Sequence, residues 1–203
     1  MTTNLISPAT PDFSITLAKA AVLGQKSDRP PAAKVVTALL ESEKFTKQQH
    51  INYPLESLIG SWRLHFVVSP KKNRQRSGVK MGKGFYVPRF VKANISFYPA
   101  ETNPTQLKIG NQLQVGLISF KFNGTAKFLG KKNLLGFDFT QIQVGFLGQT
   151  IYSGAFRGGE KKNQEFAQKH IRDLPFFAFF AIGENYIAAR GRGGGLAIWV
   201  KEG

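Results

Sequence analysis

The sequence predicts a mainly β protein: an antiparallel barrel or sandwich of about nine or ten short strands behind a pair of N-terminal helices. From Gly60 onward, short segments of alternating apolar and polar residues are separated by Gly, Asn and Pro, which is typical of such strands. The chain before Gly60 has apolar residues at helical spacing instead. With 203 residues, the protein is long enough to bury a core. We therefore expect a helical region over 1–54 that packs on a β domain over 55–203.

Two helices are expected before the first strand. Pro11-Asp12 precedes a helix over 13–23, and Gly24 marks its end. A second helix follows Pro30-Pro31, because proline is tolerated in a first helical turn. The apolar residues of this second helix, which should face the β domain, are Val35, Val36, Leu39 and Leu40.

The first strand begins with a Gly-x-Trp pattern at Gly60 and Trp62. Strict alternation would put Trp62, Leu64, Phe66 and Val68 on one buried face, and Arg63, His65 and Val67 on the other. His65 is therefore expected on the surface. Gly60 allows close passage of the backbone, and Trp62 could plug the end of a closed sheet.

Later strands are expected at similar intervals, among them 176–182, 186–190 and 196–200. Turns are expected at Asn123-Gly124 and at 131–133. A barrel of about eight strands can hold one small ligand. The 18 phenylalanines of the chain would line such a cavity or simply fill it. The candidate lining residues are Leu64, Phe66, Phe97, Phe120, Phe122, Phe137 and Phe139.

The net charge of +16 favours an anionic partner, either an anionic lipid surface or nucleic acid, over a basic surface without one. Six basic residues lie close together directly after the first strand, with no acidic residue among them: Lys71, Lys72, Arg74, Arg76, Lys80 and Lys83. This stretch is either a solvated loop or a contact for lipid head groups. Phe85, Tyr86 and Val87 could then enter the lipid interface. Lipid is favoured over nucleic acid, because most aromatic residues occupy alternating positions that should be buried.

The sequence offers little material for catalysis or metal binding. It has no cysteine, and its three histidines have no carboxylate at metal-ligand spacing. Serine-hydrolase, phosphate-loop and dinucleotide motifs are missing as well. We therefore expect no enzyme and no metal or resident cofactor. No apolar run reaches the roughly 18 residues of a membrane span.

Three segments resemble the plastid lipid-associated protein (fibrillin) family. The last 18 residues read Tyr-Ile-Ala-Ala-Arg-Gly-Arg-Gly-Gly-Gly-Leu-Ala-Ile-Trp-Val-Lys-Glu-Gly, and the family ends in Arg-Gly-Asp-x-Gly, an apolar strand and often Lys-Glu. The segment Phe146-Leu147-Gly148-Gln149 is similar to an internal family motif, and Gly60-Ser61-Trp62 matches its Gly-x-Trp strand. The chain departs from the pattern at Arg192, where the family commonly has aspartate.

The resemblance implies a lipocalin-like barrel that associates with lipids, carotenoids or prenylquinones. It also implies that Arg190 lies across Trp62 beside Gly60 as a structural pair that closes the barrel. The expected location is the cyanobacterial cytoplasm, peripheral to the thylakoid membrane, because the N-terminus resembles neither a signal nor a transit peptide. If the source is eukaryotic and a transit peptide has been removed, a plastoglobule or thylakoid of a plastid is expected instead. Related barrels attach bilin chromophores, so a bilin lyase remains an alternative. A nucleic-acid-binding module and a scaffold for other proteins are further alternatives.

Overall fold

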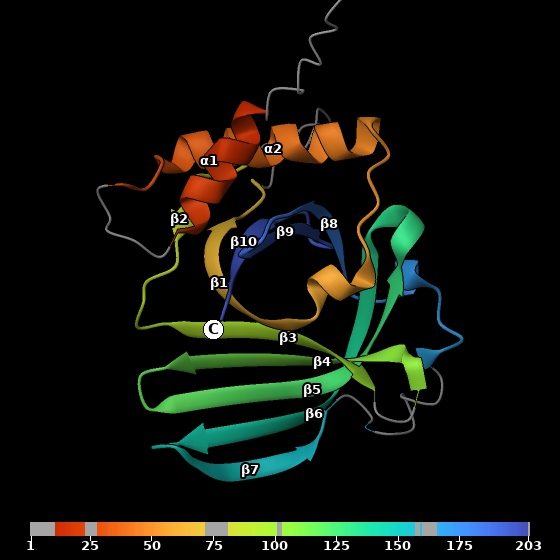
Figure 1. Ribbon diagram of the computed structural model, residues 1–203. Helices are drawn as coiled ribbons and strands as arrows, with labels where there is room; N and C mark the ends of the chain where they lie inside the picture. Colours follow the sequence, from red (N-terminus) through yellow and green to blue (C-terminus); the bar gives the residue numbers. More distant parts are fainter. Residues whose placement is uncertain are drawn as a thin grey trace, which may run out of the picture.

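Eight antiparallel strands close into a barrel in the computed structural model of the chain (Figure 1). The strand order is β10-β9-β8-β6-β5-β4-β3-β1, and β1 pairs with β10 to complete the ring. Two strands lie outside the ring, because β2 pairs with β1 and β7 pairs with β6. The prediction of a mainly β barrel with two N-terminal helices is therefore confirmed. The structure describes residues 11–22, 28–71, 81–100, 103–156, 159 and 166–202, with the side chains of 103–106 excepted.

The helices and strands have the following bounds. They are α1 Asp12–Ala21, α2 Ala32–Gln48, β1 Gly60–Val68, β2 Phe85–Tyr86, β3 Lys92–Ala100, β4 Asn103–Val115, β5 Ile118–Leu129, β6 Leu134–Phe146, β7 Gln149–Ala155, β8 Phe176–Ile182, β9 Tyr186–Gly191 and β10 Leu196–Lys201. Short 3-10 turns occur at η2 Leu55–Leu58, η3 Gly130–Lys132 and η4 Ile171–Asp173.

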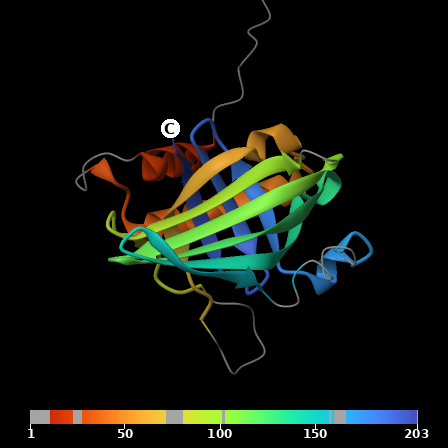
Figure 2. The same ribbon diagram turned by 90° about the horizontal axis from the view of Figure 1, so that it is seen from below.

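Two apolar clusters stabilise this arrangement, one inside the barrel and one outside it. The largest aromatic side chains of the interior are Trp62, Phe97, Phe137, Phe179 and Trp199. The second cluster lies between the two helices and the outer face of the barrel, and it includes Leu17, Val35, Leu39, Phe66, Phe180 and Ile198. Each large apolar side chain that is fully buried contributes about 1.5–3 kcal/mol. In Figure 2 the helices lie behind the barrel, and the long strands β3 to β7 run side by side in front.

Helix α2 is held on the barrel through a β-bulge in β8. The pairing of β8 with β9 shifts between Phe179 and Ala181. The carbonyl oxygen of the intervening Phe180 accepts hydrogen bonds from Ser42 Oγ (3.3 Å) and Thr46 Oγ1 (2.7 Å) of α2. Polar residues of α2 therefore face the barrel, so the predicted apolar stripe is only partly right.

The residues of this predicted apolar stripe differ in burial. Val35 and Leu39 are fully buried, whereas Leu40 is exposed. Ala38 takes a buried position on the same helix instead.

Strand β1 also contains a bulge, and this bulge overturns part of the predicted alternation. Leu64 pairs with Trp199 and Phe66 pairs with Ile198, so His65 is the extra residue. The two side chains after Leu64 consequently lie on the helix side of the strand. Phe66 belongs to the outer cluster and does not line the interior, as the sequence had suggested.

His65 is buried under the helices, which corrects its predicted place on the surface. Only 1% of its surface is exposed, and its ring contacts Tyr86 at 5.5 Å between centroids. Burial, together with the charges of Arg29, Arg63 and Arg89, lowers the pKa of His65 from 6.5 to about 4. The imidazole is therefore neutral near pH 7.

Arg190 does not lie across Trp62, which corrects the barrel-closing pair that the resemblance implied. Arg190 is on the outer face of β9, and its Nε donates to Glu43 Oε1 of α2 at 2.8 Å. Its Nη1 also donates to the carbonyl of Gly194, in the turn before β10, at 2.6 Å. The cation over the Trp62 ring is Lys201 Nζ, 6.0 Å from the centroid.

Trp62 itself is buried in the interior, at the start of β1. Its Nε1 donates to the carbonyl of Leu58 in η2 at 2.8 Å. Gly60 has a φ of 130°, which suits glycine and lets the chain turn from η2 into β1. Arg192, at the position where the chain departs from the resembled pattern, donates to the carbonyl of Leu174 at 3.0 Å and so fixes the chain before β8.

The ion pair between Arg190 and Glu43 should contribute more to stability than the ion pair between Lys47 and Glu43. The Glu43 side chain is 9% exposed and that of Arg190 is 24% exposed, whereas that of Lys47 is 72% exposed. Burial alone would raise the pKa of Glu43, but hydrogen bonds from Arg190 and Lys47 outweigh it and lower the pKa. We expect Arg190→Gln to reduce the free energy of unfolding by about 1–3 kcal/mol and Lys47→Gln by less than about 1 kcal/mol. Urea denaturation measures both changes, and equal losses would contradict the assignment.

His65 should make the stability depend on pH. In the unfolded chain a histidine takes up a proton near pH 6.5, whereas folded His65 does so only near pH 4. The unfolded state therefore binds more protons within this window, and the free energy of unfolding should fall by up to about 3 kcal/mol as the pH drops through it. His65→Phe should remove this fall, and His170→Gln, at an exposed position, should keep it. Denaturation curves at several pH values between 4 and 7 provide the measurement.

Candidate functional site

Strands β5 and β6 bend where a β-bulge interrupts their pairing. The register shifts between Asn123 and Gly124, and Thr140 is the extra residue on β6. A Cβ atom on Gly124 would lie 1.9 Å from the carbonyl oxygen of Asp138, so only glycine permits this close approach. The predicted turn at Asn123-Gly124 is therefore wrong, because both strands continue through the bend.

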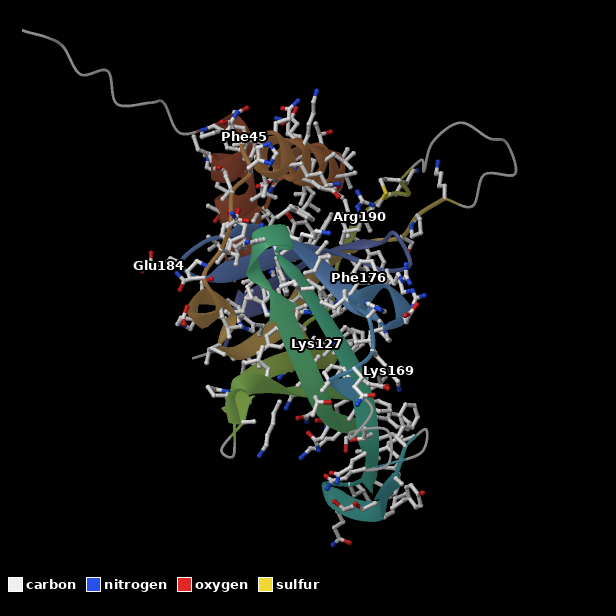
Figure 3. All side chains as sticks on the ribbon, turned by 90° about the vertical axis from the view of Figure 1, so that its right-hand side faces the viewer. Phe45, Lys127, Lys169, Phe176, Glu184 and Arg190 are labelled. Atoms are coloured by element: carbon white, nitrogen blue, oxygen red, sulfur yellow. The ribbon has the colours of Figure 1, made fainter. Side chains whose placement is uncertain are left out.

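The bend divides the long strands into a barrel wall and a projecting part, which we call the sheet extension. It comprises 111–115 of β4, 118–123 of β5, 141–146 of β6 and the whole of β7. Figure 3 shows this part below the barrel, on the side opposite the helices. Strand β6 supports both parts, because 134–136 pair with β8 and 141–146 pair with β7.

The two faces of the sheet extension have opposite character. Residues directly opposite each other in an antiparallel sheet share a face. The face that continues the barrel interior carries Asn111 and Gln149 at its edges and nine apolar or aromatic residues: Leu113, Val115, Ile118, Phe120, Phe122, Ile142, Val144, Phe146 and Tyr152. The other face carries Gln112, Gln114, Ser119, Lys121, Asn123, Gln141, Gln143 and Ser153. We call the nine apolar and aromatic residues of the first face the inner face.

The inner face is partly open to solvent. Five of its side chains are exposed, from 37% for Leu113 to 53% for Val115 and Tyr152. The other four are half-buried. Soluble monomers rarely expose a contiguous apolar patch of more than a few hundred Å², and such a patch usually binds something. The inner face is therefore the candidate site of this protein.

Aromatic contacts connect the barrel interior to the inner face. Trp199 contacts Phe177 at 5.3 Å between ring centroids, and Phe177 contacts Phe137 at 5.0 Å. The series continues through Phe139 to Phe122, with centroid separations of 5.3 and 5.7 Å. An apolar molecule on the inner face would thus contact aromatic rings at the end of that face nearest the barrel.

The predicted lining residues fall into three groups. Phe97 and Phe137 are buried in the interior, and Leu64 and Phe139 pack against that cluster while partly exposed. Phe120 and Phe122 belong to the inner face of the sheet extension. Only Phe66 is misplaced, because the bulge in β1 turns it toward the helices.

The predicted basic contact is described only at its two ends. Lys71 and Lys83 are exposed, whereas Lys72, Arg74, Arg76 and Lys80 lie outside the described residues. Of the three residues expected to enter a lipid interface, Phe85 is exposed and Val87 is buried. Tyr86 packs under the helices and donates its hydroxyl to the carbonyl of Pro30 at 2.9 Å.

Several exposed apolar residues were not singled out in the sequence. Phe90 is the most exposed large apolar side chain among the described residues, and Leu117, Leu147 and Ile151 are also exposed. Leu147 lies in the segment that resembles the fibrillin family, and that resemblance does not predict its exposure. A leucine directly before Gly148, between the apolar alternation that ends at Phe146 and the next segment, is the available signal, because turn positions are usually polar.

The ammonium group of Lys127 has a structural role on the polar side of β5. Its Nζ donates to the carbonyls of Phe166 (3.1 Å), Ala167 (3.2 Å) and Lys169, and it lies 5.2 Å from the centroid of the Phe166 ring. Figure 3 shows Lys127 and Lys169 side by side. Burial lowers the pKa of Lys127. This contact holds the chain that leads to β8 against the barrel wall.

Replacement of Gly124 should disturb the barrel at its bend. The Cβ atom of alanine there would overlap backbone and not a flexible side chain, so the free energy of unfolding should fall by about 3 kcal/mol. Gly130→Ala is the matched control, because its added Cβ would meet only the Phe128 ring at an ordinary 3.7 Å. Thermal denaturation of both variants checks this, and similar melting temperatures would contradict the role of Gly124.

Comparisons with known proteins do not identify a family for this chain. A search against models of protein families found no match, and neither did a search of curated protein sequences.

Among the described residues, no helix is both long and apolar enough to cross a bilayer, and no three His, Asp or Glu side chains are grouped so that they could hold a metal ion.

Proposed function

We propose that this chain is a non-enzymatic, lipid-associated protein that binds or shields a hydrophobic small molecule at a thylakoid or lipid-droplet surface. The observation that carries the proposal is the inner face of the sheet extension, which is apolar, half-exposed and continuous with the barrel interior. The resemblance to plastid lipid-associated proteins supports a lipid, a carotenoid or a prenylquinone as the ligand class.

An elongated apolar molecule suits this face better than a compact polar one. Cross-strand rows such as Leu113, Phe120, Val144 and Tyr152 form a strip that runs across four strands. Covering roughly 200 Å² of apolar surface gains about 5 kcal/mol before the costs of association are subtracted. Charged side chains are missing from the nine residues of the inner face, so this face supplies contact area and not ion pairs.

The charge of the chain supports an anionic lipid surface as the place of action. The net charge is +16, and exposed Lys71 and Lys83 lie at the two ends of the basic stretch. Each basic residue near an anionic membrane contributes about 1 kcal/mol of attraction. Phe85 lies two residues beyond Lys83 and is exposed, which suits contact with a lipid interface.

Polar substitution on the inner face should weaken ligand binding. Val144 lies at the centre of the inner face, and its neighbour Gln143 lies on the other face of the same strand. We expect Val144→Gln to weaken the binding of a fluorescent long-chain fatty acid about tenfold, because it places a polar group within the contact. Gln143→Ala should leave the affinity unchanged. Fluorescence titration of the purified protein provides the measurement.

Three results would contradict the proposed function. The first is equal affinity of Val144→Gln and the unaltered chain for the fatty acid. The second is salt-dependent binding of single-stranded oligonucleotides, together with organic extracts of the native protein that contain no lipid or pigment by mass spectrometry. The third is a coloured covalent adduct with a bilin, which would favour a chromophore lyase.

A further inference from the structure

Three turns at one end of the sheet carry exposed apolar residues at their tips. They are the turn over 88–91 before β3, the β4–β5 turn at Gly116-Leu117 and the β6–β7 turn at Leu147-Gly148. Phe90, Leu117 and Leu147 at these tips are 75%, 58% and 64% exposed. We call the three turns the apolar rim.

The strand register places the three turns next to one another. Lys92 at the start of β3 pairs with Gln114 near the end of β4. Ile118 at the start of β5 pairs with Phe146 at the end of β6. The Leu147 amide donates to the carbonyl of Leu117 at 2.9 Å, which joins two of the turns directly. The rim therefore spans neighbouring strands from β3 to β7, whose ends meet at the left of Figure 1.

Leu147 occupies a backbone conformation that leucine rarely adopts. Its φ is 52° and that of Gly148 is 81°, a pattern that strongly favours Asn-Gly in a two-residue hairpin turn. For a bulky side chain such as leucine, a positive φ is an outlier that costs stability. Most of this side chain is exposed, so burial in the protein does not offset the strain. A strained and exposed apolar residue indicates that the side chain contacts something other than its own chain.

Phe90 is presented by a turn that is held firmly in place. The guanidinium of Arg63 on β1 donates through Nη2 to the carbonyls of Pro88 (3.3 Å), Arg89 (3.2 Å) and Val91 (3.3 Å). The Val91 amide donates to the carbonyl of Pro88 at 3.1 Å. The ring of Phe90 therefore points outward from a fixed backbone.

The residues around the rim are basic or neutral. Arg89 and Lys92 are exposed at the turn before β3, and Lys121 is exposed on the polar face of β5, three residues from its start. The segments 88–92, 113–123 and 141–156 contain no acidic residue. Apolar tips flanked by cations suit a bilayer surface, where the tips enter the acyl region and the cations remain among anionic head groups.

We propose that the apolar rim inserts into an anionic lipid surface and orients the sheet extension on it. The inference rests on the proposed lipid-associated function and goes beyond it, because it adds an apolar contact at the rim to the charged contact over 71–83. A second copy of the chain is a poorer occupant, since each copy has a net charge of +16 and carries Arg89 and Lys92 at the rim.

The decisive variant is Leu147→Asn, because the structural and the functional roles predict opposite signs. Asparagine tolerates the positive φ of this turn, so we expect the melting temperature to rise by about 2 to 4 °C. It also removes an apolar tip, so we expect about tenfold weaker partitioning onto vesicles of phosphatidylcholine and phosphatidylglycerol. Vesicle co-sedimentation and thermal denaturation of the full chain measure the two effects.

Leu129→Asn is the matched control. Leu129 is 46% exposed, and it lies at the opposite end of β5 from the rim. Its substitution should leave vesicle partitioning unchanged. Vesicles of phosphatidylcholine alone should bind the unaltered chain more weakly than those with phosphatidylglycerol, because the cations beside the rim then lack anionic head groups.

The remaining outcomes separate this inference from the proposed function. The inference is overturned if Leu147→Asn binds vesicles as tightly as the unaltered chain, or if it lowers the melting temperature. In that case the proposed function still stands if Val144→Gln weakens the binding of the fatty acid. If sedimentation equilibrium shows a dimer that Leu147→Asn dissociates without a change in vesicle binding, the rim joins two copies and the inference fails. If the unaltered chain binds neither vesicles nor fatty acid, both proposals fail.

Discussion

The close approach of Gly124 to the backbone of Asp138 is the constraint on which the shape of this protein depends. It allows β5 and β6 to bend without a break, so that one half of each strand closes the barrel and the other half leaves it. A straight β6 could not pair with both β8 and β7. The same bend keeps the apolar side chains of both halves on one continuous face, which explains why the barrel interior and the inner face share a chain of aromatic contacts.

Bulges elsewhere in the barrel adapt its outer face to the helices. The extra residue in β1 turns His65 and Phe66 toward α1 and α2, and the bulge in β8 exposes the Phe180 carbonyl to donors from α2. The ion pair of Arg190 with Glu43 adds a charged contact between helix and barrel. The helical region is thus bound by apolar, polar and ionic contacts together, and it leaves the opposite side of the molecule to the sheet extension.

The fold was predictable from sequence because alternation and helical spacing are local patterns. The strands β8, β9 and β10 agree with the predicted ranges to within one residue at each end. Bulges are not local in this sense, because an extra residue such as His65 or Thr140 becomes evident only against the partner strand. Three wrong assignments on the described strands stem from bulges, namely the surface position of His65, the interior position of Phe66 and the turn at Asn123-Gly124. The partner of Arg190 was missed for a related reason, since 147 residues separate it from Glu43.

The three turns of the apolar rim are ordered by the protein itself, through the Arg63 guanidinium and through backbone hydrogen bonds between neighbouring turns. A surface that is already ordered loses little conformational entropy when it meets a partner, unlike a segment that folds on binding. Contact through this rim would therefore change the heat capacity only in proportion to the apolar surface removed from water.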